Sequence, residues 1–115
     1  MSENTLAFVN CIGLSDPEVV AELLDMLLEH GSLTAKQASE EIDVSYPLVL
    51  KIINNLASRG IVKTSKLKGE RGRPRKQVSL NKDIVVKLVD ECISKLERFK
   101  EAVLEAPQPA SGSRE

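Results

Sequence analysis

The chain has 115 residues with 42% apolar but only 3% aromatic residues, which suits one domain with an appendage and an aliphatic core. No apolar run approaches the length of a transmembrane helix and no signal-peptide pattern opens the sequence, so we expect a cytoplasmic protein. The net charge of −1 hides a strong segregation. Residues 1–50 hold one cation and nine anions, residues 51–82 hold ten cations and one anion, and residues 83–115 hold five cations and seven anions. The basic middle favours a polyanionic partner, with a solvated lysine-rich face as the alternative.

The first two expected helices lie in the acidic part of the chain. Apolar residues at helical spacing predict a short helix over residues 4–13, and residues 1–13 are expected to join a dimer interface. The run Ser15-Asp16-Pro17 predicts a second helix start with Ser15 as the N-cap. Gly31 is expected to end this helix, and Ser32-Leu33 to form a short extended link.

The next stretch has the pattern of a helix-turn-helix. Thr34 and Gln37 form a capping-box pair, which predicts a short helix that buries Ala38 and Ile42. A turn at residues 43–44 follows, and Ser45 is suited to cap a second helix that runs to about residue 59. This second helix, residues 45–59, is the expected recognition helix because a helix fits the major groove of DNA.

Side chains of the expected recognition helix offer groups that can read base edges. Asn pairs bidentately with adenine, Lys reaches guanine or phosphate, and Leu or Tyr can touch a thymine methyl group. The candidate DNA contacts on this helix are Ser45, Tyr46, Leu48, Lys51, Asn54 and Asn55. Leu48 and Leu50 make this face unusually apolar for a DNA reader, so a winged helix that binds protein is an open alternative.

A basic hairpin is expected directly after the recognition helix. Two β-prone runs, residues 61–66 and 77–80, flank the segment Arg71–Lys76, which predicts a hairpin over residues 61–80. Its basic part, residues 63–76, supplies further candidate DNA contacts at Lys66, Lys68, Arg71, Arg73, Arg75 and Lys76. Residues 71–74 also match the core of an AT-hook, so Arg73 either enters the minor groove or contacts phosphate.

The last expected helix has the pattern of a dimerisation element. Asn81 is placed to cap a helix over residues 82–105. Its apolar positions follow a heptad seam with spacings of 4, 3, 4, 3 and 4: Val85, Val89, Cys92, Leu96, Phe99 and Val103. The seam predicts a coiled-coil-like homodimer interface, with the direction of pairing left open. Residues 106–115 have the composition of a disordered tail.

Residues with catalytic or metal chemistry are sparse. His30 stands in the last turn of its helix without a supporting cluster, and the glycine-rich stretch lacks the pattern of a phosphate loop. Cys11 and Cys92 form no Cys-x-x-Cys motif, so we expect Cys92 to be a small buried side chain rather than part of a disulfide. The sequence predicts neither an enzyme nor a cofactor or metal.

Together these motifs resemble a known family. Residues 13–15, 28–35, 44–47, 59–62 and 72–75 look like the N-terminal winged helix of TrmB-type archaeal transcriptional regulators, and the pattern is similar to MarR-like regulators more broadly. The resemblance covers residues 13–80 and implies a dimeric transcription factor, with helix 45–59 in the major groove and Arg71, Arg73 and Arg75 in the wing. Such regulators usually continue into a sugar-binding domain, whereas this sequence stops after one long helix, so sugar sensing is not carried over. Val49-Leu50 stands where such proteins often have a Tyr.

The expected fold is therefore mainly α with a small β-hairpin. Residues 14–81 form the winged helix-turn-helix domain and residues 82–105 the dimerisation helix. The expected function is that of a dimeric, sequence-specific regulator that binds double-stranded DNA in the cytoplasm, associated with the nucleoid. An architectural protein with low sequence specificity is a further alternative. The operator, the sign of regulation and any small-molecule effector are left open.

Overall fold

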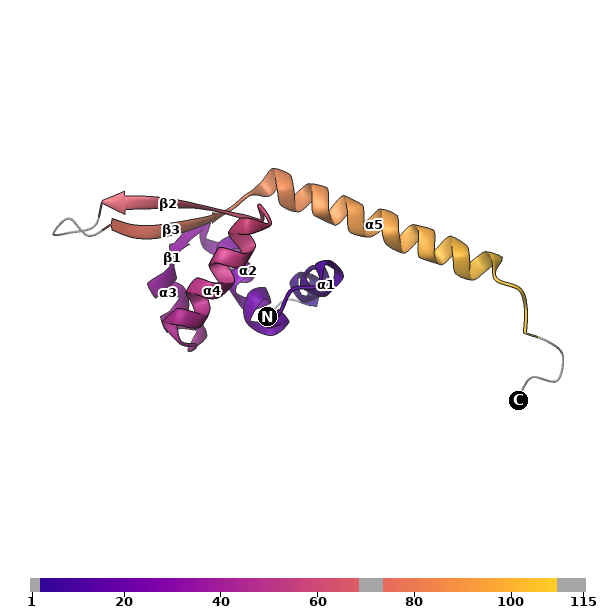
Figure 1. Cartoon of the computed structure of the whole chain (residues 1–115), viewed down its shortest axis with the longest axis horizontal. Helices are drawn as coiled ribbons and strands as arrows, with labels where there is room; N and C mark the ends of the chain where they lie inside the picture. The colour runs from indigo at the N-terminus through magenta and orange to yellow at the C-terminus, as the bar shows by residue number, and fades with distance from the viewer. Residues whose placement is uncertain (1–2, 69–73, 110–115) are drawn as a thin grey trace.

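The computed structural model describes residues 3–68 and 74–109 and has the expected winged-helix architecture (Figure 1). Helices and strands follow in the order α1 (Glu3–Ile12), α2 (Pro17–His30), β1 (Ser32–Thr34), α3 (Ala35–Ile42), α4 (Tyr46–Ser58), β2 (Val62–Lys68), β3 (Pro74–Leu80) and α5 (Lys82–Glu105). Helices α1 to α4 gather at one end of the molecule with the sheet, and α5 runs away from that end. The prediction of a mainly α fold with a helix-turn-helix, a wing and a long last helix is confirmed.

The sheet contains one more strand than expected. Its order is β1-β3-β2, with both pairs antiparallel. The segment expected to be a plain extended link is β1, and its central residue Leu33 pairs with Val78 of β3. Beside this pair, the Nε2 atom of Gln77 donates a hydrogen bond of 3.0 Å to the Ser32 hydroxyl. Three residues show too little alternation to predict a strand, so β1 forms only because a distant partner strand lies beside it.

An aliphatic core holds the helices on the sheet, as the composition predicts. Buried side chains come from every element except α5, and Leu23, Leu27, Ile53, Leu56, Ile61 and Val78 are among the most completely buried. The core fixes α4 against the sheet and leaves the opposite face of this helix free.

Local capping explains several helix ends, with two corrections. Asn81 is the N-cap residue of α5, as predicted, but its side chain makes no cap bond. The capping box of Thr34 and Gln37 is present, and Gly31 ends α2 at a φ of 82°, a backbone conformation that favours glycine. The N-cap of α2 is Asp16 and not Ser15, and it has a left-handed backbone (φ 52°) without a side-chain cap bond. Pro17 disfavours right-handed helical backbone at the preceding residue, and Asp tolerates the left-handed region.

Cys11 and Cys92 form a disulfide, which corrects the expectation of a free, buried Cys92. The bond joins α1 to α5, and the two Cα atoms are 6.4 Å apart. Cys92 is half-buried and Cys11 is exposed. Their separation of 81 residues in the sequence leaves no local signal for the pairing, which arises because α5 passes over α1.

Loss of this disulfide should lower the free energy of unfolding. The bridge joins residues 81 positions apart, and such cross-links typically contribute about 2–4 kcal/mol, mainly by restricting the unfolded chain. Cys92→Ser and Cys11→Ser should lose equal stability in urea unfolding, and a reducing agent should bring the wild type to the same level. A wild type whose unfolding midpoint ignores reducing agent would contradict the bridge.

Candidate nucleic-acid interface

Helix α4 exposes a polar face because its apolar residues are taken up by the core. Ser45 caps the helix, and its hydroxyl accepts a hydrogen bond of 3.3 Å from the Leu48 amide. The residues buried against the domain are Val49, Ile52, Ile53 and Leu56. The remaining face is therefore directed to solvent, and it begins at a capped N-terminus, where side chains of a recognition helix read base edges.

The side chains on this face match most of the expected contacts. Lys51, Asn54 and Asn55 are exposed, and Tyr46 is 46% exposed at the start of the helix. Leu48 and Leu50 are half-buried and pack against the domain's own core. The apolar character of this helix is thus largely used within its own domain, which weakens the alternative of a protein-binding face.

The hairpin places basic side chains beside α4. Lys66 of β2 lies opposite Lys76 of β3, and the Nζ atom of Lys76 donates a hydrogen bond of 2.9 Å to Oδ1 of Asn54. Lys66 pairs with Lys76, and Thr64 pairs with Val78. Because residues two apart along a strand lie on the same face, all four side chains belong to one face of the hairpin. That face covers the core near the base of the hairpin and faces α4 farther out. The sequence held no signal for this bond, because its partners are 22 residues apart.

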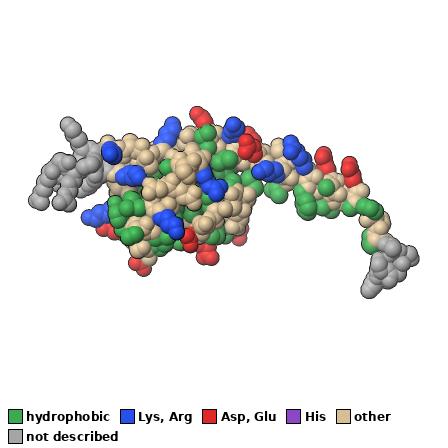
Figure 2. Space-filling model, in the orientation of Figure 1, with side chains coloured by type: hydrophobic (Ala, Val, Ile, Leu, Met, Phe, Trp, Pro, Cys, Tyr) green, Lys and Arg blue, Asp and Glu red, His purple; other side chains and the backbone are tan. Residues whose placement is uncertain are grey.

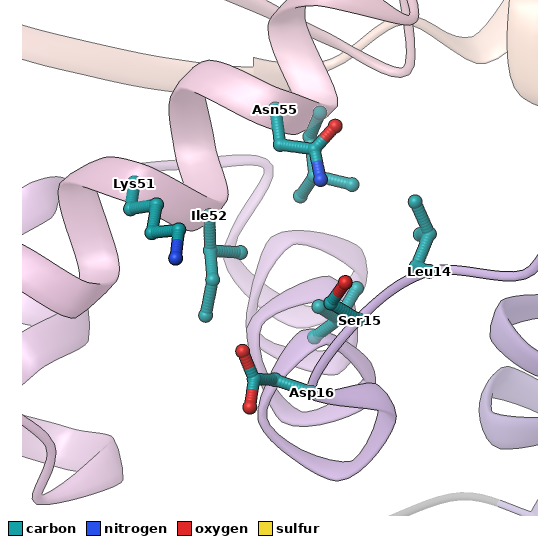
Figure 3. Close-up of a pocket in the computed structure, with 8 residues that line it drawn as sticks. Leu14, Ser15, Asp16, Lys51, Ile52 and Asn55 are labelled. Atoms are coloured by element: carbon teal, nitrogen blue, oxygen red, sulfur yellow. The ribbon is translucent and has the colours of Figure 1, made fainter.

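The other edge of the polar face borders the turn before α2. Lys51 and Asn55 line a small cavity of about 60 Å³ together with Ser15 and Asp16, as the close-up in Figure 3 shows. Sites for organic ligands usually have volumes of about 300–1,000 Å³, so this cavity is too small for an effector. Its residues are better understood as the rim of the α4 surface.

The other predicted contacts lie in the hairpin. Lys66 is exposed, and Lys68 and Arg75 lie on β2 and β3. Arg71 and Arg73 fall outside the described residues, as does most of the AT-hook-like segment. Lys63 of β2 is an additional exposed cation. In Figure 2, Lys and Arg side chains lie over the end that carries the hairpin and also along α5, where they alternate with Asp and Glu; further Asp and Glu lie along the lower edge of the domain.

Arg59, just beyond α4, has a contact that the sequence did not suggest. Its Nη1 atom donates a hydrogen bond of 3.3 Å to the carbonyl oxygen of Ile12 at the end of α1. This contact satisfies a helix-terminal carbonyl and ties α1 to the end of α4. Arg59 therefore positions the helices and is not counted among the DNA contacts.

The described part of the chain lacks two features that mark other classes of protein. In residues 3–68 and 74–109, no group of three or more His, Cys, Asp or Glu is placed to hold a metal ion. Within the same ranges, no helix is both long and apolar enough to cross a membrane.

Substitutions on the polar face of α4 should reduce discrimination between DNA sites. Lys51→Ala and Asn54→Ala each remove a group that can bond a base edge, which typically costs about 1–3 kcal/mol on the preferred site. Competition binding against a mutated site measures the effect, with Lys36→Ala on α3 as the control for loss of an exposed cation. Equal losses on preferred and random DNA would instead favour an architectural protein.

Comparison with known proteins gives one family match. A family model described as "Sugar-specific transcriptional regulator TrmB" matches residues 9–82, which is more than half of the chain. The matched region includes α2 to β3 and so contains the whole candidate interface. No curated protein matches the sequence.

Solved structures of transcriptional regulators have a similar fold. A possible transcriptional regulator from Methanosarcina mazei Go1 aligns with a TM-score of 0.58 and 13% identity, over 86% of this chain and 85% of that one. A transcriptional regulator homologue from Pyrococcus horikoshii OT3 aligns with a TM-score of 0.57 and 20% identity, over 87% and 97%. MepR from S. aureus, as a point mutant, aligns with a TM-score of 0.57 and 16% identity, over 92% and 75%. At these identities the likeness establishes the winged-helix fold alone.

Proposed function

The chain belongs to the TrmB family of transcriptional regulators, and from this premise we propose that it is a homodimer that binds specific sites on double-stranded DNA. In this proposal, α4 enters the major groove and the basic hairpin follows the DNA backbone or the adjacent minor groove. The chain is a regulator and not an enzyme, as its family indicates. We place its action in the cytoplasm, at the nucleoid.

One observation carries the DNA-binding proposal: the exposed polar face of α4 is joined to the basic hairpin. The bond between Lys76 and Asn54 holds a hairpin cation beside a side chain suited to read a base. Phosphate contacts position a protein on the duplex, and base contacts specify the sequence. An arrangement with both kinds of group on one surface therefore supports specific DNA binding over a generic basic patch.

The homodimer is supported by the exposed apolar surface of α5. None of the residues of α5 is buried, and Leu96, Phe99 and Val103 are each more than half exposed. Soluble proteins rarely leave such a contiguous stripe uncovered. A second copy of α5 would cover it and would carry a second α4, so that a near-palindromic site with half-sites about one DNA turn apart is expected.

Selection of bound genomic fragments with the purified protein tests this proposal. We expect fragments to converge on a short sequence with two-fold symmetry, and binding to that sequence to exceed binding to random DNA by about 10³-fold or more. The double variant Lys51→Ala with Asn54→Ala serves as the control and should lose the enrichment. Fragments without a shared sequence would favour an architectural role, and no DNA binding even at low salt would favour a protein partner.

A further inference from the structure

The amide group of Asn54 on α4 is oriented by a cation of the hairpin. Its Oδ1 atom accepts a hydrogen bond of 2.9 Å from the Nζ atom of Lys76 on β3. A lysine ammonium group carries three donors and no acceptor, so only the oxygen of an amide can accept a bond from it. The oxygen of Asn54 is therefore directed toward the hairpin, and its Nδ2 atom, with two donors, is turned away from Lys76.

The pairing of the strands favours this position of Lys76. Lys66 on β2 lies directly opposite, and like charges at paired positions of two strands are destabilising. Lys66 is exposed, whereas Lys76 is half-buried, as expected for a side chain that reaches the surface of α4. The bond to Asn54 thus gives the ammonium group of Lys76 a partner on the side of the helix.

The exposed surface around Asn54 is rich in hydrogen-bond donors. Lys51 is exposed one turn earlier on α4, and residues three apart on a helix are neighbours on its surface. Lys51 and Lys76 contribute ammonium groups, and Asn54 contributes its Nδ2 donors. The second lone pair of Oδ1 is the acceptor that remains in this trio, and it lies next to the positive charge of Lys76. A base that binds here is therefore expected to present acceptors rather than donors.

The major-groove edges of the four bases differ in the groups that they offer to such a surface. Guanine presents two acceptors, N7 and O6, whereas adenine presents an acceptor and a donor, thymine an acceptor and a methyl group, and cytosine a donor. An asparagine with both amide groups available pairs with adenine, because its oxygen accepts from N6 and its nitrogen donates to N7. With an ammonium group on Oδ1, the N6 donor of adenine would instead approach a cation. Guanine is the base whose two acceptors match two adjacent donors.

We propose that Lys76 sets the base preference of Asn54, so that the pair reads guanine and not adenine in the major groove. Nδ2 of Asn54 donates to one guanine acceptor, and a further N–H of the Lys76 ammonium group donates to the other. Lys76 thereby acts as a specificity-determining residue, beyond the charge that it offers to the DNA backbone. The inference rests on the entry of α4 into the major groove in the proposed function and names one base of the site.

A simpler role for Lys76 makes the opposite prediction. If its ammonium group leaves Asn54 and contacts a phosphate when DNA binds, the amide is free to pair with adenine. Lys76 would then contribute the same amount on every sequence, because phosphate contacts carry no base information directly. The base at one position of the site, and its dependence on Lys76, therefore distinguish the two roles.

Selection of DNA sites with the wild type and two variants measures this dependence. The base pair read by Asn54 is the position at which Asn54→Ala flattens the preference. We expect guanine there in the wild type, bound about tenfold more tightly than adenine. Lys76→Met removes the ammonium group and keeps the length of the side chain, so it should lower the ratio of guanine to adenine affinity at this position by about tenfold and leave the other positions unchanged. In the Asn54→Ala background, Lys76→Met should change this ratio little.

Lys66→Met is the matched control, because it removes the same charge from the paired position on the same face of the hairpin. It should weaken binding to all sequences alike and keep the preference for guanine. Lys76→Arg retains donors and should keep that preference as well. Adenine at the position read by Asn54 in the wild type, or an even loss of affinity on all sequences in Lys76→Met, would overturn the inference.

Modified guanine at this position gives a second measurement on the same site. Inosine retains both N7 and O6 and should bind as guanine does, whereas 7-deazaguanine lacks the N7 acceptor and should bind about tenfold more weakly. The loss caused by 7-deazaguanine should be smaller in Lys76→Met than in Lys66→Met. An equal loss in the two variants would contradict a role of Lys76 at the base.

The bond can also be measured without DNA, which separates this inference from the proposed function. In NMR spectra of the free protein, Lys76→Met should shift the side-chain amide signals of Asn54 more than Lys66→Met does. Equal shifts would show that Lys76 does not hold the amide and would overturn the inference even if the protein binds specific sites. A wild type that selects no shared sequence, but whose Asn54 signals depend on Lys76, would instead reject the proposed function.

Discussion

Phe99→Asp is expected to convert the dimer into monomers at micromolar concentration. Phe99 is 68% exposed in the single chain, so aspartate there leaves the fold intact and acts only where another chain covers the position. Burial of an unpaired carboxylate is costly, and a two-fold interface contains the substitution twice. We expect dimerisation to weaken by at least about 100-fold, measured by sedimentation.

Arg98→Asp is the matched control for this substitution. Arg98 is exposed on the same helix, beside Lys95 and Asp90 on its polar side, so a charge change there should leave the dimer intact. Dimeric Phe99→Asp would mean that the distal half of α5 is not the principal interface. The helix would then serve to cover its own domain, and the two copies would have to pair through another surface.

Replacing Arg71, Arg73 and Arg75 together with alanine should weaken binding to every duplex. Each lost phosphate contact is expected to reduce the slope of log affinity against log salt by about 0.9, or about 2.7 for all three. Relative to about 1 M salt, where the electrostatic contribution vanishes, this slope change corresponds to an affinity loss of roughly 500-fold at about 0.1 M salt. A salt titration of binding to preferred and random DNA measures both quantities.

Three cations on α5 provide the control for the basic hairpin. Replacing Lys87, Lys95 and Arg98 with alanine removes the same charge from the polar side of the last helix and should leave the salt slope unchanged. An unchanged slope in the hairpin variant would show that the wing does not grip phosphates. Arg73→Ala alone distinguishes minor-groove entry, because its cost should then be larger beside A·T-rich sequence than beside G·C-rich sequence.

Elements with strong local signals could be predicted from the sequence. The capping box at Thr34 depends on two side chains three residues apart, and α5 begins and ends where the sequence predicts, at residues 82 and 105. The exposed Lys51, Asn54 and Asn55 follow from the period of the helix once its buried stripe is recognised. These features depend on contacts within about one helical turn.

The remaining features of the candidate interface depend on distant residues. Nothing local indicates that Lys76 bonds Asn54, because the bond needs the hairpin to fold back over α4. The half-burial of Leu48 and Leu50 likewise follows from how α4 packs and not from its own pattern. Tertiary packing therefore decided how far Leu48 and Leu50 are withdrawn from the polar surface of this helix.

The sequence by itself determined the class of this protein, which is a winged helix-turn-helix with a basic hairpin and a long last helix that carries an apolar heptad seam. These elements follow from hydrophobic periodicity, helix caps and the distribution of charge. Only the tertiary structure decided how the parts meet. It added β1 to the sheet, joined Cys11 to Cys92, and divided the α5 seam into a half that faces its own domain and a half that is uncovered. The physical reason is that such contacts join residues far apart in the chain, and their partners exist only once the core has brought the elements together.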